Sequence, residues 1–239
     1  MQQLFLPILL LAVFQTPNAQ NPASIIAKHI EVMGGTALDS LETAIMEADM
    51  AMLIAPDVKN PMRMTIVHQQ AYRMELKTAQ VVSTVFVSGN KGWNIANLMG
   101  QRKKLPIDSV EAGELRYQTD LTGPLHRYRE KGYAVSYIGL DTLENKATAY
   151  VFKVEFAPQT TYWCYLDTTS LLEVKRRVEV PINRKLHSME LTFSDYRRVG
   201  RVMKPYQIAM QNKRGTITYT YTSILLNPPV DRKALAAEE

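Results

Sequence analysis

The residues best suited to catalysis or metal binding are scattered along this chain. None of its four histidines lies at metal-ligand spacing from another His, Cys or acidic residue. The sequence also lacks HExxH, CxxC, GxSxG and glycine-rich phosphate-binding motifs. Two runs, KRRVE at 175–179 and DYRR at 195–198, place opposite charges close together, as strand surfaces commonly do. We therefore expect no catalytic centre, no metal site and no cofactor.

Methionine is the side chain that this sequence concentrates. Six of its 12 methionines fall between residues 46 and 76, where they alternate with polar residues. Alternation at period two indicates half-buried strands, and methionine repacks easily around irregular partners. We predict that these strands line an apolar cavity for acyl chains, and an ordinary packed core is the competing interpretation. The predicted cavity residues are Met46, Met50, Met52, Met62, Met64, Met74, Trp93, Tyr150, Phe152 and Val154.

The same periodicity predicts the elements that position these side chains. Apolar and polar residues alternate through most of 43–96 and 133–226, which indicates antiparallel strands with one apolar face. A helix is predicted near 22–33, where Asn21 is a suitable N-cap and Gly34 a suitable stop. The stretch 98–130 loses the alternation and predicts a loop followed by helix, capped by Asp108 or Ser109, with a second short helix reaching Lys131. The expected fold is a mainly β open barrel covered by the N-terminal helix and this central helical insertion.

The beginning of the chain predicts export. Residues 4–14 form an uninterrupted apolar run that is too short to span a bilayer, and small residues follow it. We expect a signal peptide over 1–19, cleavage after Ala19, and a single soluble periplasmic domain over 20–239. The only cysteine, Cys164, excludes an intrachain disulfide and alternates with Tyr162 and Leu166 as a packed strand residue would. No cysteine lies directly after the apolar run, so no lipid anchor is expected.

Composition narrows the classes of partner. Hydrophobic residues make up 46% and charged residues 21%, which is typical of a folded soluble protein. The formal charge of +5 is spread along the chain, with dense basic clusters only at 102–104 and 126–131. We interpret both clusters as solvated surface, with attraction to anionic lipid or an acidic partner as the alternative. No nucleic-acid motif accompanies them.

Five loose motifs, in this order along the chain, resemble the LolA/LolB-like family of outer-membrane lipoprotein-sorting proteins in its Bacteroidetes-type form. No motif is diagnostic alone, but together they span nearly the whole predicted mature chain. They are IIAKHIEVMGG (25–35), VSGNKGWNIANLMG (87–100), TGPLHRYREKGYAVSYIG (122–139), YWCYLDTTSLLEVKRR (162–177) and FSDYRRVGRVMKPYQI (193–208).

The resemblance implies a fold and a mode of action. The fold is an unclosed antiparallel barrel of about eleven strands, with helices as a lid over an apolar cavity. The implied function is a soluble, monomeric periplasmic carrier that shelters the acyl chains of lipoproteins or lipids during transfer towards the outer membrane. Its implied partners are the acylated cargo, an inner-membrane release complex and an outer-membrane acceptor.

One departure from the family pattern bears on the lid. Related carriers have a basic residue and a proline at the turn before the third strand, where the arginine helps to latch the lid. Here the turn contains Gln69 and Gln70 and no proline. The resemblance therefore does not imply that an arginine controls the lid, and it does not imply that the cargo is a lipoprotein. A periplasmic sensory or interaction domain that binds a protein partner is the alternative. A hydrolase, with His68 or Asp195 as the residues to test, is a third.

Overall fold

The computed structural model describes residues 21–79, 81–98, 100–107, 112, 115, 117–156, 160–182, 185–213 and 215–235. The predicted signal peptide and its cleavage site lie outside these residues, as do the predicted helix caps Asp108 and Ser109.

The described chain forms one antiparallel sheet of 13 strands. Their order across the sheet is β6-β5-β4-β3-β2-β1-β13-β12-β11-β10-β9-β8-β7. The strands are β1 (Thr43–Met52), β2 (Ala55–Val67), β3 (Ala71–Lys77), β4 (Val81–Ser88), β5 (Lys91–Leu98), β6 (Gln101–Ile107), β7 (Ala134–Thr142), β8 (Thr148–Phe156), β9 (Thr160–Asp167), β10 (Glu173–Ile182), β11 (Lys185–Val199), β12 (Val202–Asn212) and β13 (Gly215–Leu226).

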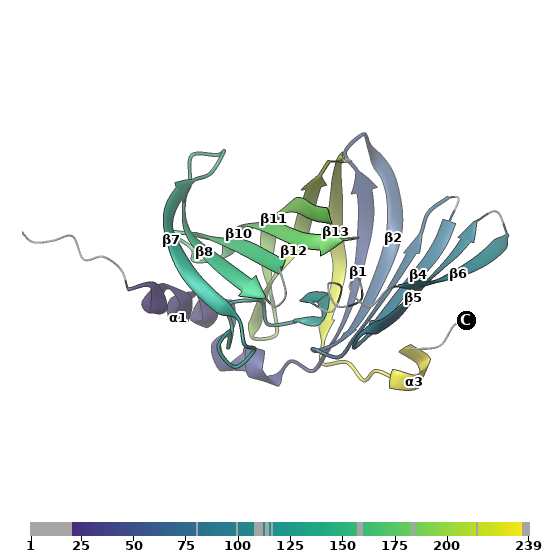
Figure 1. Cartoon of the computed structure of the whole chain (residues 1–239), viewed down its shortest axis with the longest axis horizontal. Helices are drawn as coiled ribbons and strands as arrows, with labels where there is room; N and C mark the ends of the chain where they lie inside the picture. Colours follow the sequence, from purple (N-terminus) through teal and green to yellow (C-terminus); the bar gives the residue numbers. More distant parts are fainter. Residues whose placement is uncertain are drawn as a thin grey trace, which may run out of the picture.

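The connectivity explains why the sheet remains open. The chain meanders from β1 to β6 at one edge, crosses to β7 at the opposite edge, and meanders back until β13 pairs with β1. Strands β6 and β7 do not pair with one another, so the sheet curls into a bowl rather than a closed barrel (Figure 1). The predicted open antiparallel architecture is therefore confirmed, whereas the predicted number of about eleven strands is wrong.

Strand β6 was missed because its sequence does not alternate. The residues 101–107 read QRKKLPI and were predicted to be a loop, but they pair with β5 along its whole length. Charged side chains and a proline are common on strands at the edge of a sheet, where they prevent pairing with other molecules. The basic cluster at 102–104 therefore lies on an edge strand.

The N-terminal helix forms where the sequence predicts it. Helix α1 spans Pro22–Met33; the Asn21 side chain accepts a hydrogen bond from the Ala23 N–H, and the Gly34 N–H donates to the last turn. A 3₁₀ helix, η1 (Gly35–Ser40), continues to β1. A short C-terminal helix, α3 (Arg232–Leu235), lies at the lower end of the sheet in Figure 1.

The second helix predicted in the central insertion does not form. Residues 120–132 fold as successive turns after a short 3₁₀ helix, η2 (Tyr117–Thr119). Arg127 has a φ of 47°, a left-handed conformation that ends an α-helix. The expected helical lid is thus only partly present, and we call residues 117–132 the crossover loop.

Alternation gives the sheet two distinct faces. We call the face that contacts the crossover loop the inner face and the opposite one the outer face. The buried inner core includes Leu38, Met64, Tyr72, Leu121 and Ile224. A second inner cluster is formed by residues from α1, the crossover loop, β8 and β9, and includes Ile25, Leu125, Phe152 and Cys164. The outer face has a separate cluster of Val67, Ala71, Phe86, Trp93, Ile95 and Leu235.

Candidate functional site

Three of the predicted methionines lie in one row across neighbouring strands. Met46 of β1 is paired directly with Met64 of β2, which is paired directly with Met74 of β3. Residues paired in this way point to the same face of a sheet. Ile224 of β13 and Val85 of β4 extend the row on its two sides. The methionines therefore share the inner face, as the sequence pattern predicted.

The remaining methionines of the stretch lie in adjacent rows of that face. Met62 pairs with Leu76 and is 4% exposed. Met50 pairs with Tyr219, and Met52 pairs with Ile217. Met52 is 43% exposed, so the inner face becomes progressively more open toward this end of β1.

The predicted residues of β8 are on the inner face but are already packed. Phe152 and Val154 are 1% and 0% exposed, in the cluster that includes Ile25 of α1 and Leu125 of the crossover loop. Tyr150 is partly buried at the edge of the same cluster. Because α1 fills this part of the bowl, these side chains support the wall without being accessible to a ligand.

Trp93 lies on the outer face, away from the methionines. It pairs with Pro106 and with Phe86, whose ring centroid is 5.4 Å from that of Trp93. The same cluster contains Leu235 of α3. The prediction that Trp93 belongs with the cavity residues placed it on the wrong face, because Trp93 and Ile95 of β5 point outward to the cluster with Leu235, while Asn94 between them points inward.

The accessible part of the inner face is a half-buried apolar surface across four central strands. One row runs from Phe193 of β11 through Ile208 and Tyr219 to Met50. The next row runs from Leu191 through Met210 and Ile217 to Met52. The side chains of both rows are half-buried, apart from exposed Met52. We call these two rows the apolar wall.

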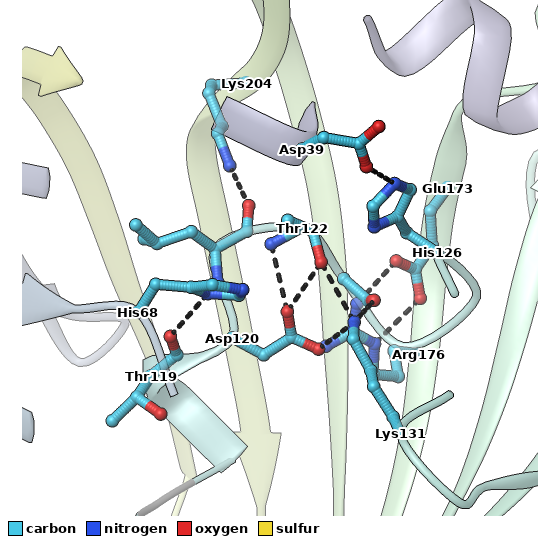
Figure 2. Close-up of polar contacts among 12 residues, drawn as sticks. Asp39, His68, Thr119, Asp120, Thr122, His126, Lys131, Glu173, Arg176 and Lys204 are labelled. Atoms are coloured by element: carbon cyan, nitrogen blue, oxygen red, sulfur yellow. Dashed lines mark hydrogen bonds and ion pairs between the residues drawn. The ribbon is translucent and has the colours of Figure 1, made fainter. Parts of the chain in front are cut away.

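The crossover loop is held at the base of the bowl by a buried polar network (Figure 2). Lys131 donates to Asp120 at 2.7 Å, to Thr122 at 2.9 Å and to the Gly123 carbonyl at 2.8 Å. All three ammonium hydrogens therefore have an acceptor. Asp120 also accepts from the backbone N–H and the hydroxyl of Thr122, at 3.0 and 2.8 Å.

Four further contacts attach this loop to its surroundings. The Leu121 N–H donates to His68 Nδ1 at 3.1 Å, and the Gln69 N–H donates to the Thr119 carbonyl at 3.1 Å. His126 Nε2 and Arg127 Nε lie 3.0 and 2.9 Å from Asp39 Oδ1 of η1. The turn that lacks the family's arginine therefore holds the loop through His68 and the Gln69 backbone.

The histidines of this region are held neutral by their burial. Loss of solvent is the largest influence lowering the pKa of His68, and nearby Lys131 and Lys204 lower it further while Asp120 opposes them. Burial also lowers the pKa of His29 and that of His126. His29 Nδ1 lies 2.7 Å from the Leu171 carbonyl. With its proton on Nε2, a neutral His68 accepts from the Leu121 N–H at Nδ1, an atom that also lies 3.3 Å from the Thr119 carbonyl.

Lys204 attaches strand β12 to the crossover loop. Its Nζ donates to the Leu121 carbonyl at 2.6 Å. Burial lowers the pKa of Lys204 to about 8, although the charge of Asp120 favours the protonated form. Sequence reasoning missed this residue, but a signal was present: Lys204 occupies an apolar position in the alternating series Val202, Lys204, Tyr206, Ile208.

A cavity of about 150 Å³ lies between the crossover loop and the sheet. Its lining combines charged and aromatic side chains, including Asp120, Glu173, Arg176, Phe193, Tyr196 and Lys204. We call it the loop cavity. Phe193 belongs both to this cavity and to the apolar wall, so the two adjoin at this residue.

The described residues contain no cluster of three or more His, Cys, Asp or Glu side chains arranged to hold a metal ion. His68 and Asp195, the residues chosen to test a hydrolase, point to different partners: His68 to the crossover loop and Asp195 to Arg197, 2.6 Å away. Among the described residues, no helix is both long and apolar enough to cross a bilayer.

Solved structures share this fold at very low sequence identity. A Vibrio parahaemolyticus domain described as an outer membrane lipoprotein-sorting protein domain matches with a TM-score of 0.56 and 13% identity, over 88% of this chain and 97% of that one. A DUF1329 family protein from Desulfovibrio piger matches with a TM-score of 0.57 and 10% identity, over 90% of this chain and 99% of that one. A LolA superfamily protein from Nitrosomonas europaea matches with a TM-score of 0.54 and 10% identity, over 90% of this chain and 97% of that one.

Comparisons of the sequence do not assign the chain to a family, since no family model and no curated protein matches it. The identities of 10–13% establish a common fold and not a common activity. The Bacteroidetes-type subgroup stays a prediction. The chain has the LolA/LolB-like fold, as the succession of its motifs predicted.

Proposed function

We propose that this protein is an exported carrier that shelters acyl chains on the inner face of its open sheet. The observation that carries the proposal is the apolar wall, two adjacent rows of apolar side chains that are only half-buried. Extended apolar surface of this kind usually marks a binding site. The likeness to lipoprotein-sorting and LolA superfamily structures supports the same proposal at the level of fold.

The energetics favour an acyl chain as the occupant. Burying a methylene group stabilises a complex by about 0.8 kcal/mol, so even partial enclosure of a long chain gives useful affinity. Met50, Met52 and Met210 lie in this wall, and their flexible thioether side chains repack around chains of different length. The proposed cargo is a lipoprotein or lipid in transit through the periplasm towards the outer membrane.

A lipophilic neutral probe, Nile red, tests the proposal directly. We expect its fluorescence to rise on binding the mature protein, and we expect native mass spectrometry of the purified protein to reveal bound acyl material. Met50→Glu places a charge in the apolar wall and should weaken probe binding at least tenfold. Gln211→Glu is the matched control, because Gln211 is exposed and lies on the outer face beside Met210.

The outcomes separate the proposed carrier from a protein-binding domain. Weak binding in Met50→Glu, with normal binding in Gln211→Glu, supports a carrier that uses the inner face. Equal binding in both variants would contradict it. Absence of binding to the native protein would instead favour the sensory or interaction domain.

A further inference from the structure

Lys204 differs from the other cations around the loop cavity. Lys131 has Asp120 as its partner at 2.7 Å, and Arg176 makes a two-point contact with Glu173. Arg176 is also held between the rings of Tyr162 and Phe193, at 5.3 and 5.2 Å from their centroids. Within the part of the chain that the structure describes, Lys204 forms no ion pair and donates to a neutral carbonyl.

A cation that is removed from water without forming an ion pair opposes folding. Removing an ammonium group from water costs free energy that a neutral carbonyl only partly compensates. Titratable groups in such unfavourable positions cluster at functional sites, where a ligand can supply the missing charge. Asp120 and Glu173 also line the loop cavity, but they form their ion pairs with Lys131 and Arg176. The charge of Asp120 favours protonated Lys204 without forming an ion pair with it.

The loop cavity has the size and position for a small head group. Its volume of about 150 Å³ accommodates several water molecules or one compact anion. Lys204, Tyr196 and Arg176 are among its lining residues, and Phe193 belongs also to the apolar wall. From Phe193 the row crosses four strands to Met50, a distance of roughly 14 Å at about 4.8 Å between strands.

We propose that the carrier binds a single-chain anionic amphiphile, with its carboxylate or phosphate head paired with Lys204 in the loop cavity and its tail along the row from Phe193 to Met50. This inference rests on the proposed function and narrows its cargo to lipids with an exposed acidic head. A charge-assisted hydrogen bond from Lys204 to the head replaces the weaker bond to the Leu121 carbonyl.

Displacement of Nile red by three amphiphiles with the same 16-carbon chain tests this pairing. Palmitate and hexadecyl phosphate have an anionic head, whereas hexadecanol is neutral; all are used below their aggregation concentrations at pH 7 and fixed ionic strength. We expect the two anions to displace the probe at concentrations at least tenfold lower than hexadecanol. If both anions displace the probe with a similar advantage over hexadecanol, the site recognises charge. If only one anion has the advantage, the site recognises that head group.

Variants at Lys204 test whether this residue recognises the anionic head group. Lys204→Met keeps the length of the side chain and should reduce the advantage of the anions to less than threefold, with hexadecanol unaffected. Lys204→Arg should retain the advantage. Lys91→Met, which removes an exposed positive charge from β5, should leave it unchanged.

The proposed function and this inference fail in different ways. If Nile red does not bind the native protein, both are overturned. If it binds but the three amphiphiles compete equally, or if Lys204→Met retains the full preference for anions, only the inference is overturned.

Discussion

Lys204 Nζ and the Leu121 carbonyl oxygen are 2.6 Å apart, and this bond joins a half-buried cation of β12 to the crossover loop. The arrangement predicts that Lys204→Met increases stability at neutral pH. Burial lowers the pKa of Lys204 from 10.5 to about 8, a difference that corresponds to roughly 3 kcal/mol. Loss of the hydrogen bond to the Leu121 carbonyl offsets about 1 kcal/mol of this gain in stability. We expect the free energy of unfolding to rise by on the order of 2 kcal/mol at pH 7.

The pH dependence of this effect provides its control. Below pH 8 Lys204 is charged in both the folded and the unfolded protein, so the full cost of burial is present. Between pH 8 and 10.5 the folded protein releases its proton first and the cost declines. Urea denaturation should therefore show that the advantage of Lys204→Met shrinks as the pH rises from 8 to 9.5. A variant less stable than the native protein at pH 7 would contradict the prediction.

The contact between His68 and Leu121 predicts loss of stability in mild acid. The folded protein lowers the pKa of His68, so the unfolded chain binds a proton more readily as the pH falls below about 6.5. Stability is complete above that pH and declines below it. Asparagine at position 68 still accepts from the Leu121 N–H but does not titrate. Denaturation at pH 7 and pH 5 should reveal a smaller loss in His68→Asn than in the native protein, with exposed His187→Asn as the control.

Cys164 should be unreactive in the folded protein. Its side chain is fully buried in the inner core beside Phe152, and burial raises the pKa of the thiol. The thiolate is the reactive form, so both inaccessibility and protonation protect it. We expect no reaction with a disulfide reagent at pH 8 until denaturant is added. Thr192→Cys, at an exposed outer position, should react at once; an equally rapid reaction of Cys164 would refute the packing described.

The sequence was most informative where one short-range rule decides the structure. Period two placed Met46, Met64 and Met74 on a single face, and the register then aligned them in one row. Helix α1 was predictable because Asn21 and Gly34 supply its two ends. These features depend on residues close together in the chain.

Features that depend on distant segments were not predictable from such rules. Period two shows that Trp93 and Ile95 share a face, but only the position of α3 determines that this face is the outer one. The turns of the crossover loop depend on contacts with His68 and Asp39, which lie far from it in sequence. Lys204 was visible as a charged residue in an apolar series, and the partner that explains it, Leu121, is 83 residues away.

The outer position of Trp93 predicts that its replacement affects stability and leaves ligand binding intact. Trp93 is 9% exposed and packs with Phe86 and Leu235, so Trp93→Ala should lower the free energy of unfolding by about 3–5 kcal/mol. Trp93→Phe keeps most of this packing and provides folded protein for binding measurements. Its affinity for Nile red should equal that of the native protein, since the sheet separates position 93 from the apolar wall. Weakened binding in Trp93→Phe would mean that the ligand contacts the outer face, and the proposed location of the cargo would then be wrong.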